Sequence, residues 1–199
     1  MTDPITEKQT LRREITNRLK DITSGAFHQA GIAAAALLQT TPLWQNYQTL
    51  LIFLSMKDEI DTQPLLEAAL AAGKKVFAPK LRGPDLQFIG VMAPEGPWGR
   101  DSFGIRAPAN SGPLLEAEHF PALIITPGLG FDKKGGRLGR GKGFYDRFFS
   151  ALQSSPETSS FFALGLCMPP QILPEIPLEK NDLLMDAVCD GLTYWNNSR

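Results

Sequence analysis

Two nearly continuous apolar runs, separated by one helix-length segment, constrain the fold of this chain more than any other feature of its sequence. The runs are TLLIFLSM at 49–56 and KKVFAP at 74–79, and such runs are typical of strands buried on both faces. Between them lies DTQPLLEAALAAG, where Pro64 suits a first helical turn and Gly73 a helix end. Strand, helix and strand in this order predict a parallel pair joined by a right-handed crossover.

Further strands extend this pattern over most of the chain. The segments are LQFIGV at 86–91, expected to be more exposed, ALIITPG at 122–128, FFALGLC at 161–167 and the short MDAVCD at 185–190. The Gly- and Pro-rich segment 93–113 is expected to be irregular loop. Alternating strands and helices predict an α/β fold, in which a mostly parallel central sheet is flanked by helices. We expect one three-layer sandwich domain spanning residues 1–199.

The first part of the chain, from about residue 6 to residue 38, has a helical pattern. Apolar residues fall four, four and three positions apart, which forms one stripe of an amphipathic helix, at Leu11, Ile15, Leu19 and Ile22. Gly25 and Gly31 predict a break, after which IAAAALLQT forms a second helical piece. Lys8 and Arg12 share a face beside the stripe, and the simplest interpretation is two solvated charges on a surface helix.

Composition excludes several classes of protein. The 199 residues carry a net charge of −1, so a general attraction to nucleic acid or to anionic membranes is not expected. No apolar run reaches the length of a membrane span, and the polar N-terminus does not resemble a signal peptide. Cys167 and Cys189 lie in apolar surroundings without a C-x-x-C motif, which predicts reduced, buried thiols. We expect a cytoplasmic monomer that acts on small molecules.

The segment GGRLGRGKGFYD at 135–146 is the strongest candidate for a binding site. Its first nine residues contain five glycines and three basic side chains. The segment follows the buried strand at 122–128 and leads directly into GFYDRFFSALQ, which is expected to be helical. Ligands of open α/β sheets bind where strands end, and helix N-termini attract anions. The residues 135–143 therefore predict a phosphate-binding loop, although glycines that merely serve turns remain an alternative.

Two known phosphate motifs come close to this loop and fail. Residues 136–142 fit G-x-x-x-x-G-K, but Gly143 follows where a P-loop requires Ser or Thr. The dinucleotide pattern G-x-G-x-x-G fails because Gly139 and Gly141 are followed by Phe144 at its third glycine position. If a nucleoside triphosphate binds here, its magnesium needs another ligand, and Asp146 is the nearest carboxylate.

The segment PGLGFDKKGGRLGRGKGFYDRFF closely resembles the signature of the 5-formyltetrahydrofolate cyclo-ligase family. Three further stretches resemble the same family in the same order, namely KQTLRREITNRL, LIFLSMKDEIDT and NDLLMDAVCD. The resemblance implies conversion of 5-formyltetrahydrofolate to 5,10-methenyltetrahydrofolate, with ATP going to ADP and phosphate. It implies that the formyl oxygen attacks the γ-phosphate to give an iminium phosphate, after which N10 closes the ring. Mg²⁺ would be the cofactor.

The resemblance also assigns residues to roles. It gives ATP to Lys8, Arg12, Arg137, Leu138, Gly139, Arg140, Gly141, Lys142, Gly143, Phe144 and Tyr145, among which Lys142, Arg140 and Tyr145 would be catalytic. The folate would contact Met56, Glu59 and Phe103, and Asp146 and Asp186 would hold the metal. Three of these residues have a simpler interpretation: Glu59 as a solvated loop carboxylate, Phe103 as a local core residue, and Asp186 as an ordinary surface residue.

The sequence departs from the family pattern at two positions, and two alternative functions stay open. Phe144 stands where many members have Tyr, and Arg106 occupies a position where a polar or acidic residue or Pro is common. A non-catalytic protein that binds folate or nucleotide with the same fold is the main alternative. An RNA-binding role is less favoured, because the loop has no surrounding basic face or interleaved aromatic run.

Overall fold

A seven-stranded sheet forms the centre of the protein, in the order β12-β11-β9-β6-β1-β2-β3. The computed structural model describes residues 4–109, 112–179 and 182–197. The strands are β1 (Thr49–Ile52), β2 (Lys75–Arg82), β3 (Asp85–Val91), β4 (Trp98–Arg100), β5 (Arg106–Pro108), β6 (Ala122–Thr126), β7 (Gly130–Asp132), β8 (Arg137–Leu138), β9 (Phe161–Leu166), β10 (Ile172–Leu173), β11 (Ala187–Cys189) and β12 (Tyr194–Asn196). The helices are α1 (Pro4–Leu19), α2 (Ser24–Gln39), α3 (Pro42–Asn46), α4 (Gln63–Ala71) and α5 (Phe144–Gln153), with short 3₁₀ turns at Ala117–His119 and Pro169–Gln171.

The inner strands of the sheet are parallel, as the buried apolar runs predicted. β2, β1, β6, β9 and β11 pair in parallel, with Leu50 of β1 opposite Leu123 of β6. The two edge strands are antiparallel: β3 folds back on β2, and β12 folds back on β11. Helices cover the faces of such a sheet, because the connection between two parallel strands usually contains a helix that packs on one face. The expected mostly parallel α/β sheet is confirmed.

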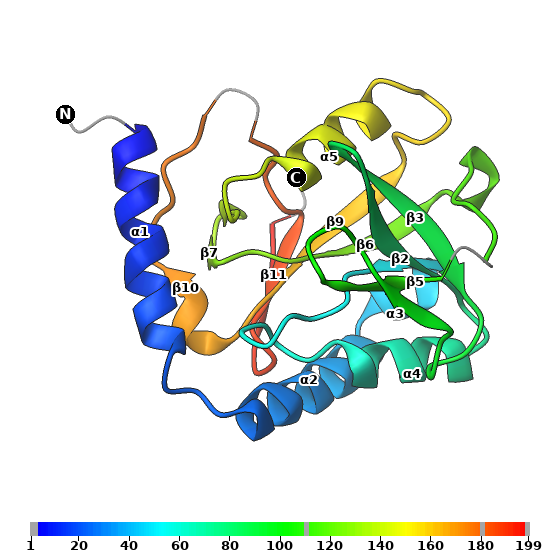
Figure 1. Ribbon diagram of the computed structural model, residues 1–199, viewed down its shortest axis with the longest axis horizontal. Coiled ribbons are helices and arrows are strands. Elements are labelled where there is room, and N and C mark those ends of the chain that lie inside the picture. The colour runs from blue at the N-terminus through cyan, green and yellow to red at the C-terminus, as the bar shows by residue number, and fades with distance from the viewer. Residues whose placement is uncertain (1–3, 110–111, 180–181, 198–199) are drawn as a thin grey trace.

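Two apolar clusters lie on the two faces of the sheet and define three layers. Leu50 and Ile52 pack in one cluster together with Leu38 of α2 and Leu66 of α4. The intervening Leu51 packs in the other cluster, which includes residues of α5. Successive residues of a strand point to opposite faces. Figure 1 accordingly shows α2 and α4 together on one side of the sheet and α5 on the other.

The N-terminal helical region breaks earlier than predicted. α1 ends at Leu19 and α2 begins at Ser24, with Thr23 as its N-cap accepting a hydrogen bond from the Ala26 N–H at 3.2 Å. The predicted break at Gly25 and Gly31 is therefore wrong, because both glycines lie inside α2. Gly31 serves close packing instead: a Cβ there would lie 2.0 Å from the carbonyl oxygen of Asp61.

Several short strands were not predicted. Segment 93–113 is not wholly irregular, because it contains the antiparallel hairpin of β4 and β5. The loop at 135–143 contains a short strand, since β8 pairs with β7, which in turn pairs with β10 in a second small sheet. These strands have two or three residues each. Such lengths are too short for a periodic hydrophobic pattern to appear in the sequence.

The two cysteines are free and buried, as expected. Burial is the main cause that raises the pKa of Cys167 well above that of an ordinary thiol, and burial raises the pKa of Cys189 to about 11. Both thiols are therefore protonated and unreactive at neutral pH. No helix in the described parts of the chain combines the length and apolar character that crossing a membrane requires.

Candidate functional site

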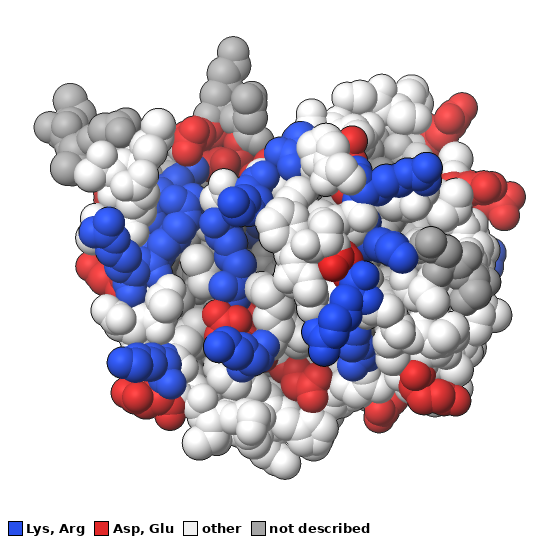
Figure 2. Space-filling model, viewed as in Figure 1, with Lys and Arg blue, Asp and Glu red and all other residues white. Residues whose placement is uncertain are grey.

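A cavity of about 650 Å³ opens where the parallel strands end. Its wall includes Phe53, Leu54 and Met56, which follow β1, and Pro127 and Gly128, which follow β6. The carboxyl ends of parallel strands are where α/β sheets bind ligands. Figure 2 shows Lys and Arg atoms spread across this face of the molecule, with Asp and Glu atoms among them. The site is thus locally charged in a protein whose net charge is close to zero.

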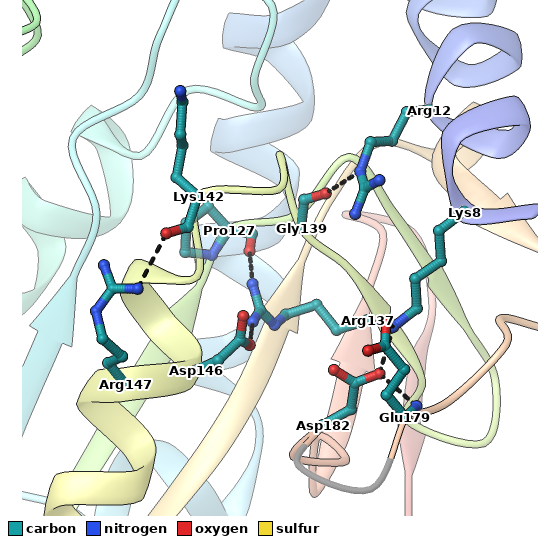
Figure 3. Close-up of polar contacts among 10 residues, drawn as sticks. All are labelled: Lys8, Arg12, Pro127, Arg137, Gly139, Lys142, Asp146, Arg147, Glu179 and Asp182. Carbon is teal, nitrogen blue, oxygen red and sulfur yellow. Dashed lines mark hydrogen bonds and ion pairs between the residues drawn. The ribbon is translucent and has the colours of Figure 1, made fainter. Parts of the chain in front are cut away.

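The glycine-rich loop forms one side of the cavity, here called the loop side, which spans residues 137–146. Gly141 has φ +87° and Gly143 has φ +68°, a backbone conformation that glycine adopts without strain. Gly143 is the N-cap of α5, so the loop passes directly into a helix N-terminus, as predicted. The Arg12 Nε donates to the Gly139 carbonyl oxygen at 2.9 Å and so joins α1 to the loop (Figure 3).

Arg137 and Asp146 form an ion pair on the loop side. The Arg137 guanidinium donates to the Asp146 carboxylate, which lies in the first turn of α5 (Figure 3). The Arg137 side chain is nearly buried, whereas that of Asp146 is 40% exposed and lines the cavity. In the described parts of the chain, no group of three or more His, Cys, Asp or Glu residues is arranged to hold a metal ion. Asp146 is therefore a single-carboxylate candidate ligand.

Lys8 is buried between two carboxylates from the C-terminal part of the chain. Its Nζ lies 2.7 Å from Glu179 Oε1 and 2.6 Å from Asp182 Oδ2 (Figure 3). Burial lowers the pKa of Lys8, but hydrogen bonds and charge interactions with both carboxylates outweigh it and raise the pKa overall. The ammonium therefore stays charged. The simplest sequence interpretation, a solvated surface charge, does not fit, because the side chain is only 7% exposed.

Glu59 forms the centre of the other side of the cavity, here called the strand side, which includes Met56, Glu59 and Phe103. Its Oε2 accepts from the Met56 N–H at 3.0 Å, and its Oε1 accepts from the Arg140 Nε and Nη2 at 3.3 and 3.2 Å. Burial is the largest influence on Glu59 and raises its pKa, which the positive charge of Arg140 only partly offsets. Arg140 also pairs with Asp58 at 3.0 Å.

Aromatic side chains complete the wall. Phe103 is 59% exposed, and its ring meets that of Phe144 edge-on at 6.1 Å between centroids. An exposed aromatic residue in a cavity wall is available to stack on a flat ligand, and Phe103 is not a local core residue. The hydroxyl of Tyr145 is buried and has no hydrogen-bond partner in the described structure. Burial raises the pKa of Tyr145, so the phenol remains protonated.

Three of the predicted site residues lie apart from this arrangement. Lys142 lines the cavity but is exposed, and its ammonium points away from the other charged groups (Figure 3). Leu138 is fully buried in the core as part of β8 and does not line the cavity. Asp186 does not line it either: its carboxylate, placed just before β11, accepts from the Ala163 N–H at 2.7 Å. The structure thus does not bring Asp186 together with Asp146.

Sequence reasoning missed a buried carboxylate that organises the loop. Asp132 is 3% exposed and ends β7. Its Oδ1 accepts from the N–H groups of Lys134 and Gly136 at 2.8 and 2.9 Å, and its Oδ2 accepts from the Ile176 N–H at 2.9 Å. Asp132 therefore fixes the start of the glycine-rich loop against the segment that follows β10. An Asp before K-K-G-G is a turn signal in the sequence, but its long-range partner was not predictable.

Comparison with known proteins gives one consistent result. The chain matches the 5-formyltetrahydrofolate cyclo-ligase family over residues 4–191. It is 30% identical to the probable 5-formyltetrahydrofolate cyclo-ligase of Schizosaccharomyces pombe, over 92% of this chain and 94% of that protein. It is also 30% identical to the Escherichia coli K12 5-formyltetrahydrofolate cyclo-ligase, over 91% and 98% respectively.

A solved structure supports the fold. The Aquifex aeolicus 5,10-methenyltetrahydrofolate synthetase superposes with a TM-score of 0.80 at 23% identity, covering 96% of this chain and 93% of that one. The sequence resemblance is therefore confirmed over nearly the full length: this chain is an enzyme of the 5-formyltetrahydrofolate cyclo-ligase family.

Proposed function

We propose that this enzyme converts 5-formyltetrahydrofolate to 5,10-methenyltetrahydrofolate with the use of ATP and Mg²⁺, releasing ADP and phosphate. The observation that carries the proposal is that one cavity is lined both by the cationic glycine-rich loop and by Met56, Glu59 and Phe103. Phosphoryl transfer requires both substrates in one water-excluding site. Family membership supports the folate reaction, and the chemistry of the loop supports the nucleotide.

The loop side is suited to a triphosphate. Arg137, Arg140 and Lys142 supply positive charge on a backbone whose glycines allow N–H groups to approach phosphate oxygens. Arg12 adds a cation from α1, and Lys8 of the same helix also lines the cavity, paired with Glu179 and Asp182. The α5 N-terminus begins at Gly143 and adds its partial positive charge. Leu138 is buried in the core, so in this proposal it supports the loop and does not contact the nucleotide.

The strand side is suited to a reduced folate. The pterin ring presents adjacent N–H donors, and the Glu59 carboxylate in the cavity wall is a buried acceptor for such donors. Phe103 would stack on the ring system, which is worth about 0.5–1.5 kcal/mol beyond the area buried. Met56 lies beside Glu59 and supplies an adaptable apolar contact.

The reaction needs positioning and charge neutralisation rather than a protein nucleophile. The formyl oxygen attacks the γ-phosphorus, and the bond to the bridging oxygen of ADP breaks. N10 then attacks the formyl carbon and loses its proton, while the bond from that carbon to oxygen breaks and phosphate leaves. In this proposal Arg140 and Lys142 neutralise charge on the transferring phosphoryl group, and the Tyr145 hydroxyl, which has no hydrogen-bond partner among the described residues, donates to it.

The residues of the loop side fit a magnesium ion bound together with ATP. Mg²⁺ is usually held by one or two carboxylates plus substrate phosphates, and Asp146 supplies one exposed carboxylate there. When bound, Mg²⁺ would neutralise phosphate charge. Asp146 would hold it, and Arg137, which now pairs with Asp146, would be released toward the phosphates. Asp186 has no part in this proposal, because it does not line the cavity.

Formation of the methenyl product tests the proposal directly. Purified protein with 5-formyltetrahydrofolate, Mg²⁺ and ATP should develop the near-ultraviolet absorbance of 5,10-methenyltetrahydrofolate, with one phosphate released per product. Omitting ATP should abolish the signal. Calorimetric binding of both substrates without product or phosphate would instead identify a non-catalytic binding protein. We also propose that the enzyme acts as a monomer in the cytoplasm.

A further inference from the structure

Arg140 links the two sides of the cavity. It belongs to the glycine-rich loop, yet its guanidinium contacts the two carboxylates of the strand side rather than other groups of the loop. Its Nη2 lies 3.0 Å from Asp58 Oδ1, and its Nε and Nη2 both point at Glu59 Oε1, at 3.3 and 3.2 Å. The second oxygen of Glu59 is occupied by the Met56 N–H. Glu59 Oε1 is therefore the acceptor that Arg140 holds.

The edge of a guanidinium and the edge of a pterin present the same chemistry to a carboxylate. A guanidinium offers two parallel N–H donors through Nε and one Nη. The 2-amino-4-oxo ring of a reduced pterin offers two parallel N–H donors through N3 and the 2-amino group. Both would bind the same oxygen of Glu59, so the contact with Arg140 and a contact with pterin exclude one another.

We propose that Arg140 occupies the pterin-binding position on Glu59 and that nucleotide phosphates draw it away, so that ATP binding opens the folate site. Asp58 is the positioning residue that holds Arg140 in this place. The inference rests on the proposed function, because it takes the loop side for nucleotide and the strand side for folate. It adds a coupling between them through a single side chain.

The backbone around Arg140 permits this movement. Glycines flank it on both sides, and Gly141 already has a positive φ of +87°. The Arg140 side chain is 35% exposed, so it is not locked by packing. Neither Arg137 nor Lys142 contacts Asp58 or Glu59 among the contacts of the described residues. Arg140 is thus the loop cation that can exchange between the carboxylates and a phosphate.

The burial of Glu59 makes the coupling favourable in both directions. A buried carboxylate that loses a cationic partner is costly. Arg140 is the cation paired with Glu59 among the described residues, and the Glu59 side chain is 8% exposed. Phosphate binding therefore leaves Glu59 in need of new donors, which the pterin edge supplies. By thermodynamic linkage, if ATP increases the affinity for folate by some factor, folate increases the affinity for ATP by the same factor. Typical coupling of this kind changes affinity by about tenfold.

Equilibrium binding separates the proposal from the catalytic assignment, because it needs no turnover. Calorimetry with 5-formyltetrahydrofolate would be done with and without Mg²⁺ and a non-hydrolysable ATP analogue. In the unaltered protein, the analogue should lower the Kd for folate by about tenfold. Absence of binding by either ligand would reject the proposed function itself, whereas independent binding of both would reject only the coupling.

Three variants locate the coupling. Asp58→Asn keeps the size of the side chain but weakens the hold on Arg140, so folate alone should bind several-fold tighter and the effect of the analogue should shrink. Arg140→Gln should remove the competition and abolish the coupling. Lys142→Gln is the matched control, because it removes a neighbouring loop cation while leaving the contacts of Glu59 intact, and folate alone should bind it as tightly as before. Weaker folate binding by Asp58→Asn and Arg140→Gln would overturn the proposal and would make Arg140 an aid to folate instead.

Discussion

Replacing Asp132 by Asn tests whether a single carboxylate holds the glycine-rich loop in place. The substitution preserves shape and leaves one oxygen for the Lys134 and Gly136 N–H groups. It turns an amide NH₂ toward the Ile176 N–H, which loses its 2.9 Å acceptor. A buried donor left unpaired costs about 1–3 kcal/mol, and the two remaining bonds weaken because their acceptor is no longer charged. We expect the free energy of unfolding to fall by about 2–4 kcal/mol.

Asp190→Asn is the matched control for this measurement. Asp190 is also buried, at 6% exposure, but both of its hydrogen bonds, from the Leu192 and Thr193 N–H groups, go to one oxygen. An asparagine retains that oxygen, so its loss of stability should stay below about 1 kcal/mol. Urea denaturation followed by tryptophan fluorescence gives both values. Equal losses in the two variants would refute the role assigned to the second oxygen of Asp132.

Three further predictions concern the loop, the strand side and the helical layer. Lys142→Ala should raise the KM for ATP about tenfold, because one charged hydrogen bond is lost, and should leave the Kd for folate unchanged. If kinetics and calorimetry show that ATP and folate binding weaken equally, Lys142 has another role. The pKa of Glu59 is raised above the ordinary carboxyl value of 4.5, so its ionisation destabilises the fold as the pH rises above that value. Glu59→Gln should therefore unfold at a higher denaturant concentration than the unaltered protein at pH 7, and at the same concentration near pH 4, while folate binding is lost. A difference in stability that persists unchanged at low pH would contradict this. Gly31→Ala should destabilise the protein by about 1–3 kcal/mol, because its Cβ would clash with the Asp61 carbonyl oxygen. Gly25→Ala lies in the same helix, but no atom lies closer than 3.9 Å to its new Cβ. It should therefore be neutral or stabilising in thermal denaturation.

The central strands were predictable because parallel strands are apolar on both faces. β1, β6 and β9 each appear as an unbroken apolar run, and the burial of every residue of β1 and β6 is the reason. The hairpin of β4 and β5 was missed because its strands have three residues each within a Gly- and Pro-rich segment. The break between α1 and α2 was misplaced because a glycine can serve close packing as well as interruption.

The cluster of glycines and cations in the loop is visible in the sequence, whereas the ion pairs of the site are not. A run of glycines and cations after a buried strand is a local signal, and the structure places nearly all of its residues in one cavity. Ion pairs between distant segments have no local signal. Lys8 and Asp182 lie 174 positions apart, and Arg140 and Glu59 lie 81 apart. Asp186 shows a related limit, because a short strand does not reveal in sequence which of its ends faces the cavity.

The ion pairs of Lys8 with Glu179 and Asp182 also set an order of events during synthesis. A ribosome delivers the first helix long before the segment that neutralises its buried ammonium, and a contact across so much chain forms late. The nascent chain therefore cannot complete this part of the cavity wall until Glu179 and Asp182 have emerged. Under the proposed function this wall belongs to the nucleotide site, so partial chains that end before residue 179 should not bind ATP.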